Sequence, residues 1–289
     1  MRRVLPLVLA TALALSGCSR NAALASADPS LSPSVEPSEA THTPDGSAPP
    51  VPSAASRATG SAPSSSRCDR PTVAVNSARA TAIGPYGSKQ TTGSAAIALT
   101  FDDGPDPVNT PLMLDVLRRC GVKATFCVVG YKAAMFPDVI RRMVSEGHTL
   151  CNHSWQHNTQ LGTYDRDSIR QDLQRTNDAI HRIVPDVRVS YFRAPGGLWT
   201  ADYATVAHQL GMTPLDWDVD PKDWNLPMYG TGKAMTLHIV SWVESHVRPG
   251  SIVLSHDYQK PATVAAYRIL LPWLSARFTL IPLPSAPVT

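Results

Sequence analysis

The sequence predicts an α/β fold, because short apolar runs alternate with helical patterns from about Ala95 onward. Most of the apolar runs are continuous rather than alternating with polar residues, which is typical of parallel strands buried on both faces. The segments between them carry apolar residues at helical spacing. Buried parallel strands joined by helices form an open sheet or a barrel, and the pattern alone leaves both forms open.

Each strand is expected where an apolar run lies between turns. Strands are predicted at residues 95–101, 124–130, 148–153, 189–194, 212–217, 251–256 and 278–283. Helices are predicted at residues 110–121, 133–147, 166–184, 200–211, 231–247 and 263–276. Gly121, Gly147 and Gly211 stand where three of these helices end, which is where glycine commonly terminates a helix.

The first 18 residues have the composition of an export signal. Arg2 and Arg3 precede an apolar run at residues 4–15, and small residues follow it. The string Leu-Ser-Gly-Cys at residues 15–18 resembles a bacterial lipobox, which predicts that Cys18 is lipid-modified and anchors the protein to the membrane. The alternative is secretion after cleavage near Ala25 or Ala27.

The segment at residues 19–66 is rich in Ser, Pro and Ala and is expected to be a disordered linker. Residues 67–94 form an N-terminal extension, and residues 95–284 form the folded domain. A net charge of +3 without blocks of like charge argues against a nucleic-acid partner. We expect a monomer.

Polar side chains recur at the carboxyl ends of the predicted strands, where α/β proteins gather their functional groups. The set comprises Asp102, Asp103, His153, His157, Arg193, Asp220, Asp223 and His256. Asp, Gly and Pro are also ordinary turn residues, so Asp102 and Asp103 alone would indicate only a turn. Because polar residues recur at the end of one strand after another, a functional site is favoured over a set of unrelated turns.

The segment His-Ser-Trp-Gln-His places His153 and His157 four residues apart, which directs both imidazoles to one side on a helical turn or a tight loop. Together with one carboxylate they would form a two-histidine, one-aspartate metal site with open positions.

Five segments in order resemble the motifs of the polysaccharide deacetylase family, the NodB-homology carbohydrate esterases. They are TFDDGP, HSWQH, FRAPGG, DPKDW and LSH. The resemblance implies a distorted (β/α) barrel and one divalent metal, usually zinc, with cobalt as the alternative. It also implies hydrolytic removal of acetyl groups from sugars, most often in N-acetylglucosamine polymers.

Carried over to this sequence, the resemblance assigns a role to each polar residue. Metal ligands would be Asp103, His153 and His157. Asp102 would be the general base held by Arg193, and His256 the general acid oriented by Asp220. Asp223 is expected to be structural.

The resemblance also implies a substrate pocket. Trp224 and Leu254 would line the pocket for the acetyl methyl group, and the backbone N–H of Gly196 would bind the developing oxyanion. Many relatives carry an aromatic residue where this chain has Gly196. Trp155, Trp199 and Trp217 are candidates for a sugar-binding groove, although packing in the core is the commoner role of an aromatic residue.

Four cysteines remain after Cys18, which allows one or two disulfides in an exported protein. We predict a Cys68–Cys120 bond that pins the N-terminal segment to the domain. Cys127 and Cys151 lie in neighbouring predicted strands, where disulfide geometry is harder to meet.

The sequence therefore predicts a metal-dependent deacetylase of peptidoglycan or chitin-like polysaccharide on the outer face of the bacterial cytoplasmic membrane. An acetylxylan O-deacetylase is the near alternative. A non-catalytic glycan-binding protein on the same fold is the alternative from another class, and the presence of all six main motif residues disfavours it.

Overall fold

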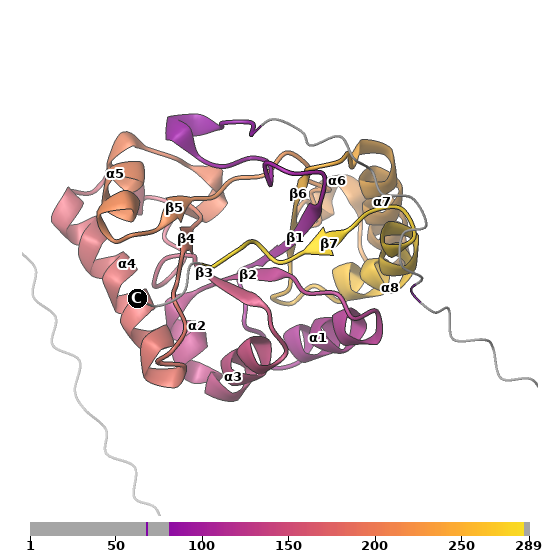
Figure 1. Ribbon diagram of the computed structural model, residues 1–289, viewed down its shortest axis with the longest axis horizontal. Helices are drawn as coiled ribbons and strands as arrows, with labels where there is room; N and C mark the ends of the chain where they lie inside the picture. The colour runs from indigo at the N-terminus through magenta and orange to yellow at the C-terminus, as the bar shows by residue number, and fades with distance from the viewer. Residues whose placement is uncertain (1–67, 69–80, 286–289) are drawn as a thin grey trace, which may run out of the picture. The chain divides into compact units, whose positions relative to one another are not determined.

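The computed structural model describes residue 68 and residues 81–285, and these contain one seven-stranded parallel sheet (Figure 1). Its order is β5-β4-β3-β2-β1-β6, and β7 pairs with the start of β1. The strands are β1 (Ile97–Asp102), β2 (Thr125–Val128), β3 (Thr149–Asn152), β4 (Tyr191–Phe192), β5 (Thr213–Pro214), β6 (Ile252–His256) and β7 (Leu280–Ile281). All seven predicted strands are confirmed.

The helices lie outside this sheet (Figure 1). They are α1 (Asn109–Arg119), α2 (Gly130–Met135), α3 (Pro137–Ser145), α4 (Arg166–Ile183), α5 (Ala201–Gln209), α6 (Leu226–Tyr229), α7 (Gly232–His246) and α8 (Pro261–Ser275), with 3₁₀ turns at Pro85–Gly87, Leu161–Thr163 and Pro195–Gly197. Gly121, Gly147 and Gly211 follow α1, α3 and α5 with positive φ, as predicted for helix terminators.

One predicted helix, at residues 133–147, is two helices. The break falls at Phe136, whose φ of −124° and ψ of 59° are not helical. Pro137 accounts for the break, because a proline disfavours the helical conformation of the residue before it and is well suited to the first turn of a helix. The sequence pattern missed α6, which is only one turn long.

The sheet curls into a distorted barrel, as predicted. Val219, in the segment after β5, forms a parallel bridge to Val253 of β6, so the two ends of the strand order approach each other. Alternate residues of each strand face opposite sides. Leu99 and Phe101 belong to the large core that also contains helix residues, whereas Ala98 and Ile252 belong to a small inner cluster. This double burial explains the continuous apolar runs.

Residues of the expected N-terminal extension pack onto the barrel. Lys89 forms a parallel bridge to Leu215, Thr91 forms an antiparallel bridge to Ser251, and the Gln90 side-chain amide donates to Asp216. These residues lie beside β5 and β6 and are part of the folded unit.

Two disulfides join the four described cysteines. The Cys68–Cys120 bond is confirmed. The expectation that Cys127 and Cys151 would not bond is wrong, because β2 and β3 place them directly opposite each other with Cα atoms 4.1 Å apart. Both side chains lie in the inner cluster, so the two sulfur atoms meet there.

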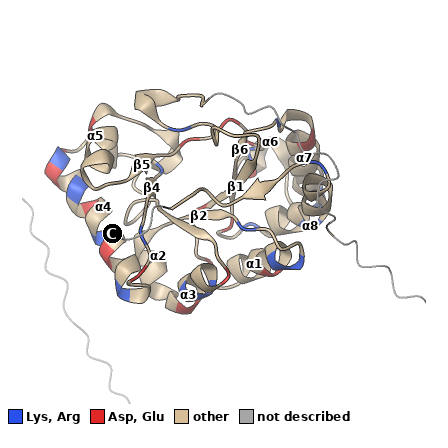
Figure 2. Ribbon diagram, viewed as in Figure 1, with Lys and Arg blue, Asp and Glu red and all other residues tan. Residues whose placement is uncertain are grey.

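Charged residues of both signs are mixed on the outer helices (Figure 2). Asp115 of α1, for example, pairs with Arg118 and with Arg142 of α3. Among the described residues, no helix is long and apolar enough to cross a membrane. Cys18, the export signal and the linker at residues 19–66 lie outside the described residues.

Candidate active site

The predicted polar residues meet at the carboxyl ends of the strands. Asp102 ends β1 and is in register with His256, which ends β6. His153 follows β3 directly, and Arg193 follows β4. Because parallel strands end at one rim of the barrel, the order of the strands brings these side chains together although the chain separates them widely.

Asp103, His153 and His157 form one cluster, whose candidate ligand atoms all lie within 4.8 Å of one another. Asp103 Oδ1 is 3.4 Å from His153 Nε2 and 3.3 Å from His157 Nε2. This oxygen is buried and has no hydrogen-bond partner among the described residues. Asp103 and His157 adopt positive φ angles of 75° and 56°.

Neighbouring groups orient the two imidazoles. His153 Nδ1 lies 2.8 Å from the carbonyl oxygen of Arg193 and donates to it, so its Nε2 faces Asp103. The backbone N–H of His157 donates to Ser154 Oγ at 3.0 Å, which shapes the loop between the histidines. Burial, together with the charge of His153, lowers the pKa of His157, so this ring is neutral near pH 7.

The cluster fits a divalent metal ion. A buried carboxylate oxygen without a hydrogen-bond partner faces the Nε2 atoms of two imidazoles, and a cation among the three atoms would be bound by all of them. Burial alone would raise the pKa of Asp103, but the interaction with His153 and the charge of His256 hold it far below its usual range. Asp103 is therefore anionic, as a ligand must be.

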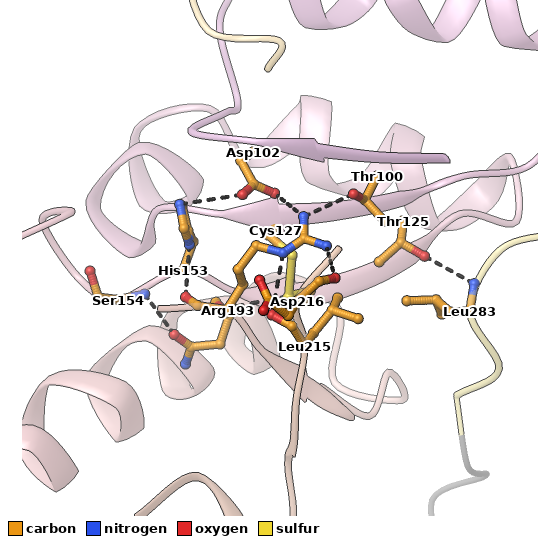
Figure 3. The surroundings of a disulfide bond; sticks show 12 residues. Thr100, Asp102, Thr125, Cys127, His153, Ser154, Arg193, Leu215, Asp216 and Leu283 are labelled. Carbon is orange, nitrogen blue, oxygen red and sulfur yellow. Dashed lines mark hydrogen bonds and ion pairs between the residues drawn. A yellow bond between two sulfur atoms is a disulfide. The ribbon is translucent and has the colours of Figure 1, made fainter. Parts of the chain in front are cut away.

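Asp102 lies between this cluster and Arg193: one carboxylate oxygen faces His153 and the other faces Arg193 (Figure 3). Asp102 Oδ1 accepts from Arg193 Nη1 at 2.7 Å, and both side chains are almost completely buried. The same Nη1 donates to Thr100 Oγ1 at 2.8 Å, and Nη2 donates to the carbonyl oxygen of Asp216 at 3.0 Å. The guanidinium is thus fixed on several sides, and it fixes Asp102.

His256 pairs with Asp223, not with Asp220. Asp223 Oδ1 lies 2.6 Å from His256 Nδ1. Asp223 Oδ2 accepts from the backbone N–H of His256 at 2.9 Å and from Thr263 Oγ1 at 2.7 Å. The expectation that Asp220 orients His256 and that Asp223 is structural is therefore wrong. The chain turns between these residues, so that Asp223 is fully enclosed behind the imidazole.

The pair changes the protonation of His256. Burial would lower the pKa of His256, but the charge and hydrogen bond of Asp223, with smaller contributions from Asp103 and Asp102, raise it to about 9. Asp220 instead accepts from the N–H of Lys222 at 2.7 Å, and burial raises its pKa. The sequence signal for Asp223 was its place in the DPKDW segment, which does not distinguish two aspartates three residues apart.

A cavity of about 310 Å³ opens beside these groups, within the size range of small-ligand sites. The predicted pocket residues Gly196, Trp224 and Leu254 line it, and so do Trp217 and Asp220. Gly196 has φ 64°, a left-handed conformation that glycine adopts without strain.

Two of the three candidate groove tryptophans lie elsewhere. Trp199 is buried in the core against Phe192 and Tyr203. The ring of Trp155 stacks with the guanidinium of Arg175 at 3.9 Å. Of these three tryptophans, only Trp217 lines the cavity.

Sequence reasoning missed two buried groups next to the site. Lys132 Nζ donates to the backbone oxygen of Asp103 at 2.8 Å, and no motif pointed to this lysine. Asp257 receives a hydrogen bond from Thr110 Oγ1, and burial raises its pKa to about 7. Its position directly after the Leu-Ser-His segment was the available signal.

Comparison with known proteins agrees with this geometry. A family model described as polysaccharide deacetylase matches residues 89–215. A chitooligosaccharide deacetylase from Sinorhizobium fredii is 41% identical over 202 residues, which cover 66% of this chain and 90% of that protein. A peptidoglycan-N-acetylglucosamine deacetylase from Bacillus cereus is 31% identical over 205 residues, which cover 69% of each chain.

A solved structure gives the same result for the fold. The family 4 carbohydrate esterase from Streptomyces lividans in complex with acetate matches with a TM-score of 0.58 at 31% identity, over 65% of this chain and 91% of that one. Together with the barrel and the residues at its rim, these likenesses show that the protein belongs to the polysaccharide deacetylase family and is a carbohydrate deacetylase.

Proposed function

We propose that the protein is a metal-dependent N-deacetylase of polysaccharides that contain N-acetylglucosamine, such as peptidoglycan or chitin-like chains. The observation that carries the proposal is the divergence of two adjacent carboxylates. Asp103 faces His153 and His157, whereas Asp102 is bonded through one oxygen to Arg193 and keeps the other oxygen toward His153. One carboxylate is thereby suited to hold a cation and the other to move a proton.

Asp103, His153 and His157 would hold the metal, which when bound polarises the substrate carbonyl and lowers the pKa of water. Zinc suits this mixed nitrogen and oxygen set, and cobalt is the alternative.

Asp102 acts as the general base. Its Oδ1 is held by Arg193, and its Oδ2 lies 3.7 Å from His153 Nε2, on the side of the metal cluster. Oδ2 is therefore the oxygen that accepts a proton from the attacking water, while a bond forms between the water oxygen and the amide carbon. The N–H of Gly196, at the cavity wall, supports the developing oxyanion.

His256 acts as the general acid. Asp223 occupies Nδ1, so Nε2 carries the proton that faces the cavity. As the carbon–nitrogen bond breaks, Nε2 gives this proton to the departing nitrogen, and the products are acetate and a free amine. Trp224 and Leu254 provide apolar surface for the acetyl methyl group.

The names of the Sinorhizobium and Bacillus relatives support an amide substrate over an ester. The test is acetate release by purified, metal-loaded protein from chitin oligomers, peptidoglycan and acetylxylan. We expect release from the first two at rates well above that from acetylxylan. Preference for acetylxylan would identify an O-deacetylase, and binding without release from any polymer would identify a glycan-binding protein.

We also propose that Cys18 carries a lipid that holds the protein on the outer face of the cytoplasmic membrane. The lipobox-like string at residues 15–18 supports this location. A substrate in the cell wall would then lie within reach.

A further inference from the structure

The start of α2 is bonded to both loops that carry the candidate metal ligands. The N–H of Val129, the residue before the helix, donates to the carbonyl oxygen of Gly104 at 2.9 Å. The N–H groups of Gly130 and Tyr131 donate to the carbonyl oxygens of residues 154–155, at 2.9 and 3.0 Å. The first turn of a helix leaves such N–H groups without partners inside the helix, so they are available for these bonds. One helix end thereby ties the loop after β1 to the loop after β3.

Lys132 adds a side-chain bond to this set. Its Nζ donates to the backbone oxygen of Asp103 at 2.8 Å. The lysine is only 7% exposed, and its Nζ lies 3.1 Å from the centre of the Tyr258 ring. The ring face attracts the ammonium and covers it. Lys132 is therefore confined against the carbonyl group of Asp103.

The backbone of Asp103 is one that requires support. Its φ of 75° is a left-handed conformation that residues other than glycine rarely adopt, and such a residue keeps it only where its surroundings hold it. The carbonyl groups of Asp103 and Gly104 both accept from residues 129–132, so two consecutive peptide groups of this turn are fixed. Rotation of this turn would carry the Asp103 carboxylate away from His153 and His157.

The charge of Lys132 does not explain its presence beside a metal site. Its Nζ is bonded to the backbone of a candidate ligand, and an ammonium that close repels a bound cation. The charge of the lysine therefore weakens metal binding, whereas its hydrogen bond can strengthen it. Because the two effects have opposite signs, a variant that loses both shows which one is larger.

We propose that Lys132 is a positioning residue, which holds the backbone of Asp103 so that its carboxylate reaches the same cation as His153 and His157. This inference rests on the proposed metal-dependent function. It adds a residue that lies outside the five motif segments and acts through Asp103.

The test measures Zn²⁺ affinity by competition with a colorimetric chelator. Lys132→Met keeps the length of the side chain but removes the donor and the charge. We expect it to raise the Kd for Zn²⁺ roughly tenfold to a hundredfold, the range for loss of a group that orients a metal ligand. Lys123→Met is the matched control, because it makes the same change before the start of β2, at the other end of that strand, and should leave the Kd unchanged. The metal-free proteins should all unfold at the same temperature.

Three results would overturn the proposal. Tighter Zn²⁺ binding by Lys132→Met would show that the charge outweighs the hydrogen bond. An unchanged Kd, with or without a lower unfolding temperature, would reduce Lys132 to a part of the fold. An equal rise of the Kd in Lys123→Met would show that the effect is not specific to this position. If Lys132→Met does not fold, Lys132→Gln, whose amide is neutral and shorter, is held to the same criteria.

The wild-type protein separates this inference from the proposed function. If it binds Zn²⁺ and releases acetate while Lys132→Met binds Zn²⁺ equally well, the positioning role is wrong and the function stands. If the wild-type protein binds no Zn²⁺ and releases acetate without it, the metal-dependent function fails, and the role of Lys132 fails with it.

Discussion

Asp223 contacts His256 twice, because its carboxylate meets the ring Nδ1 and accepts from the backbone N–H of His256, while the hydroxyl of Thr263 donates to the same carboxylate. Burial would raise the pKa of Asp223, but the charge of His256 and these hydrogen bonds lower it, so the aspartate remains ionised beside a protonated imidazole. The pair stores the proton that the departing amine requires.

The pH dependence of kcat/KM should report this pair. His256 must be protonated to act, and its pKa is about 9, so activity should be retained at neutral pH and lost as the pH rises through about 9. Asp223→Asn removes the negative charge, so the alkaline limb should move to lower pH. Asp220→Asn is the matched control and should shift the limb less. If the alkaline limb shifted further in the Asp220 variant than in the Asp223 variant, Asp220 would be the residue that orients His256.

Asp102→Asn and Asp103→Asn should fail in different ways. The first should keep bound metal and lower turnover by roughly 10²–10⁴, the range for loss of a general base. The second should lose metal, because it replaces an anionic ligand with a neutral amide. Metal content by mass spectrometry, measured beside acetate release, checks both. The same metal content and the same residual rate in the two variants would contradict the division of roles.

Removal of the metal should abolish acetate release. We expect a chelator to eliminate activity and Zn²⁺ or Co²⁺ to restore it, whereas Mg²⁺ should restore little, because two imidazoles favour the softer ions. The measurement is turnover of chelator-treated, dialysed protein with each ion added back. Full activity in a sample shown to be metal-free would exclude the proposed chemistry.

The location prediction concerns Cys18. If it carries two or more acyl chains, each buried CH₂ contributes about 0.8 kcal/mol, and the protein should fractionate with membranes. A flexible linker of the length of residues 19–66 would span on the order of 40 Å, enough to reach wall polymer. Cys18→Ser should release the protein or block its maturation, as seen by fractionation and intact mass. Unchanged processing and membrane association would show that another feature anchors it.

Much of the fold could be predicted because short stretches of sequence determine where its strands and helices lie. Continuous apolar runs marked every strand, and the glycines marked three helix ends. The proline effect at Phe136 is also local, but apolar spacing continues across it and concealed the break. What the sequence could not supply was register. Only the alignment of β2 with β3 brings Cys127 opposite Cys151.

The same limit explains why the predicted roles of Asp220 and Asp223 were reversed. Both follow β5 in an irregular segment; Asp220 lies four residues before Trp224 and Asp223 lies directly before it. Which one meets His256 depends on the bridge from Val219 to Val253, which sets how the segment turns past the end of β6. By contrast, the contact between Asp102 and Arg193 could be anticipated from the resemblance, since each residue ends a strand at the same rim.

The two disulfides have a consequence for how the chain is oxidised. They join Cys68 to Cys120 and Cys127 to Cys151, so the partners follow one another along the chain and neither loop encloses the other. If the cysteines are oxidised in chain order, each native pair can therefore form in turn without an exchange of partners. Cys18 is the one cysteine that precedes them, and as a free thiol it would compete for Cys68. The proposed lipid would block that thiol, so the anchor would also protect correct pairing.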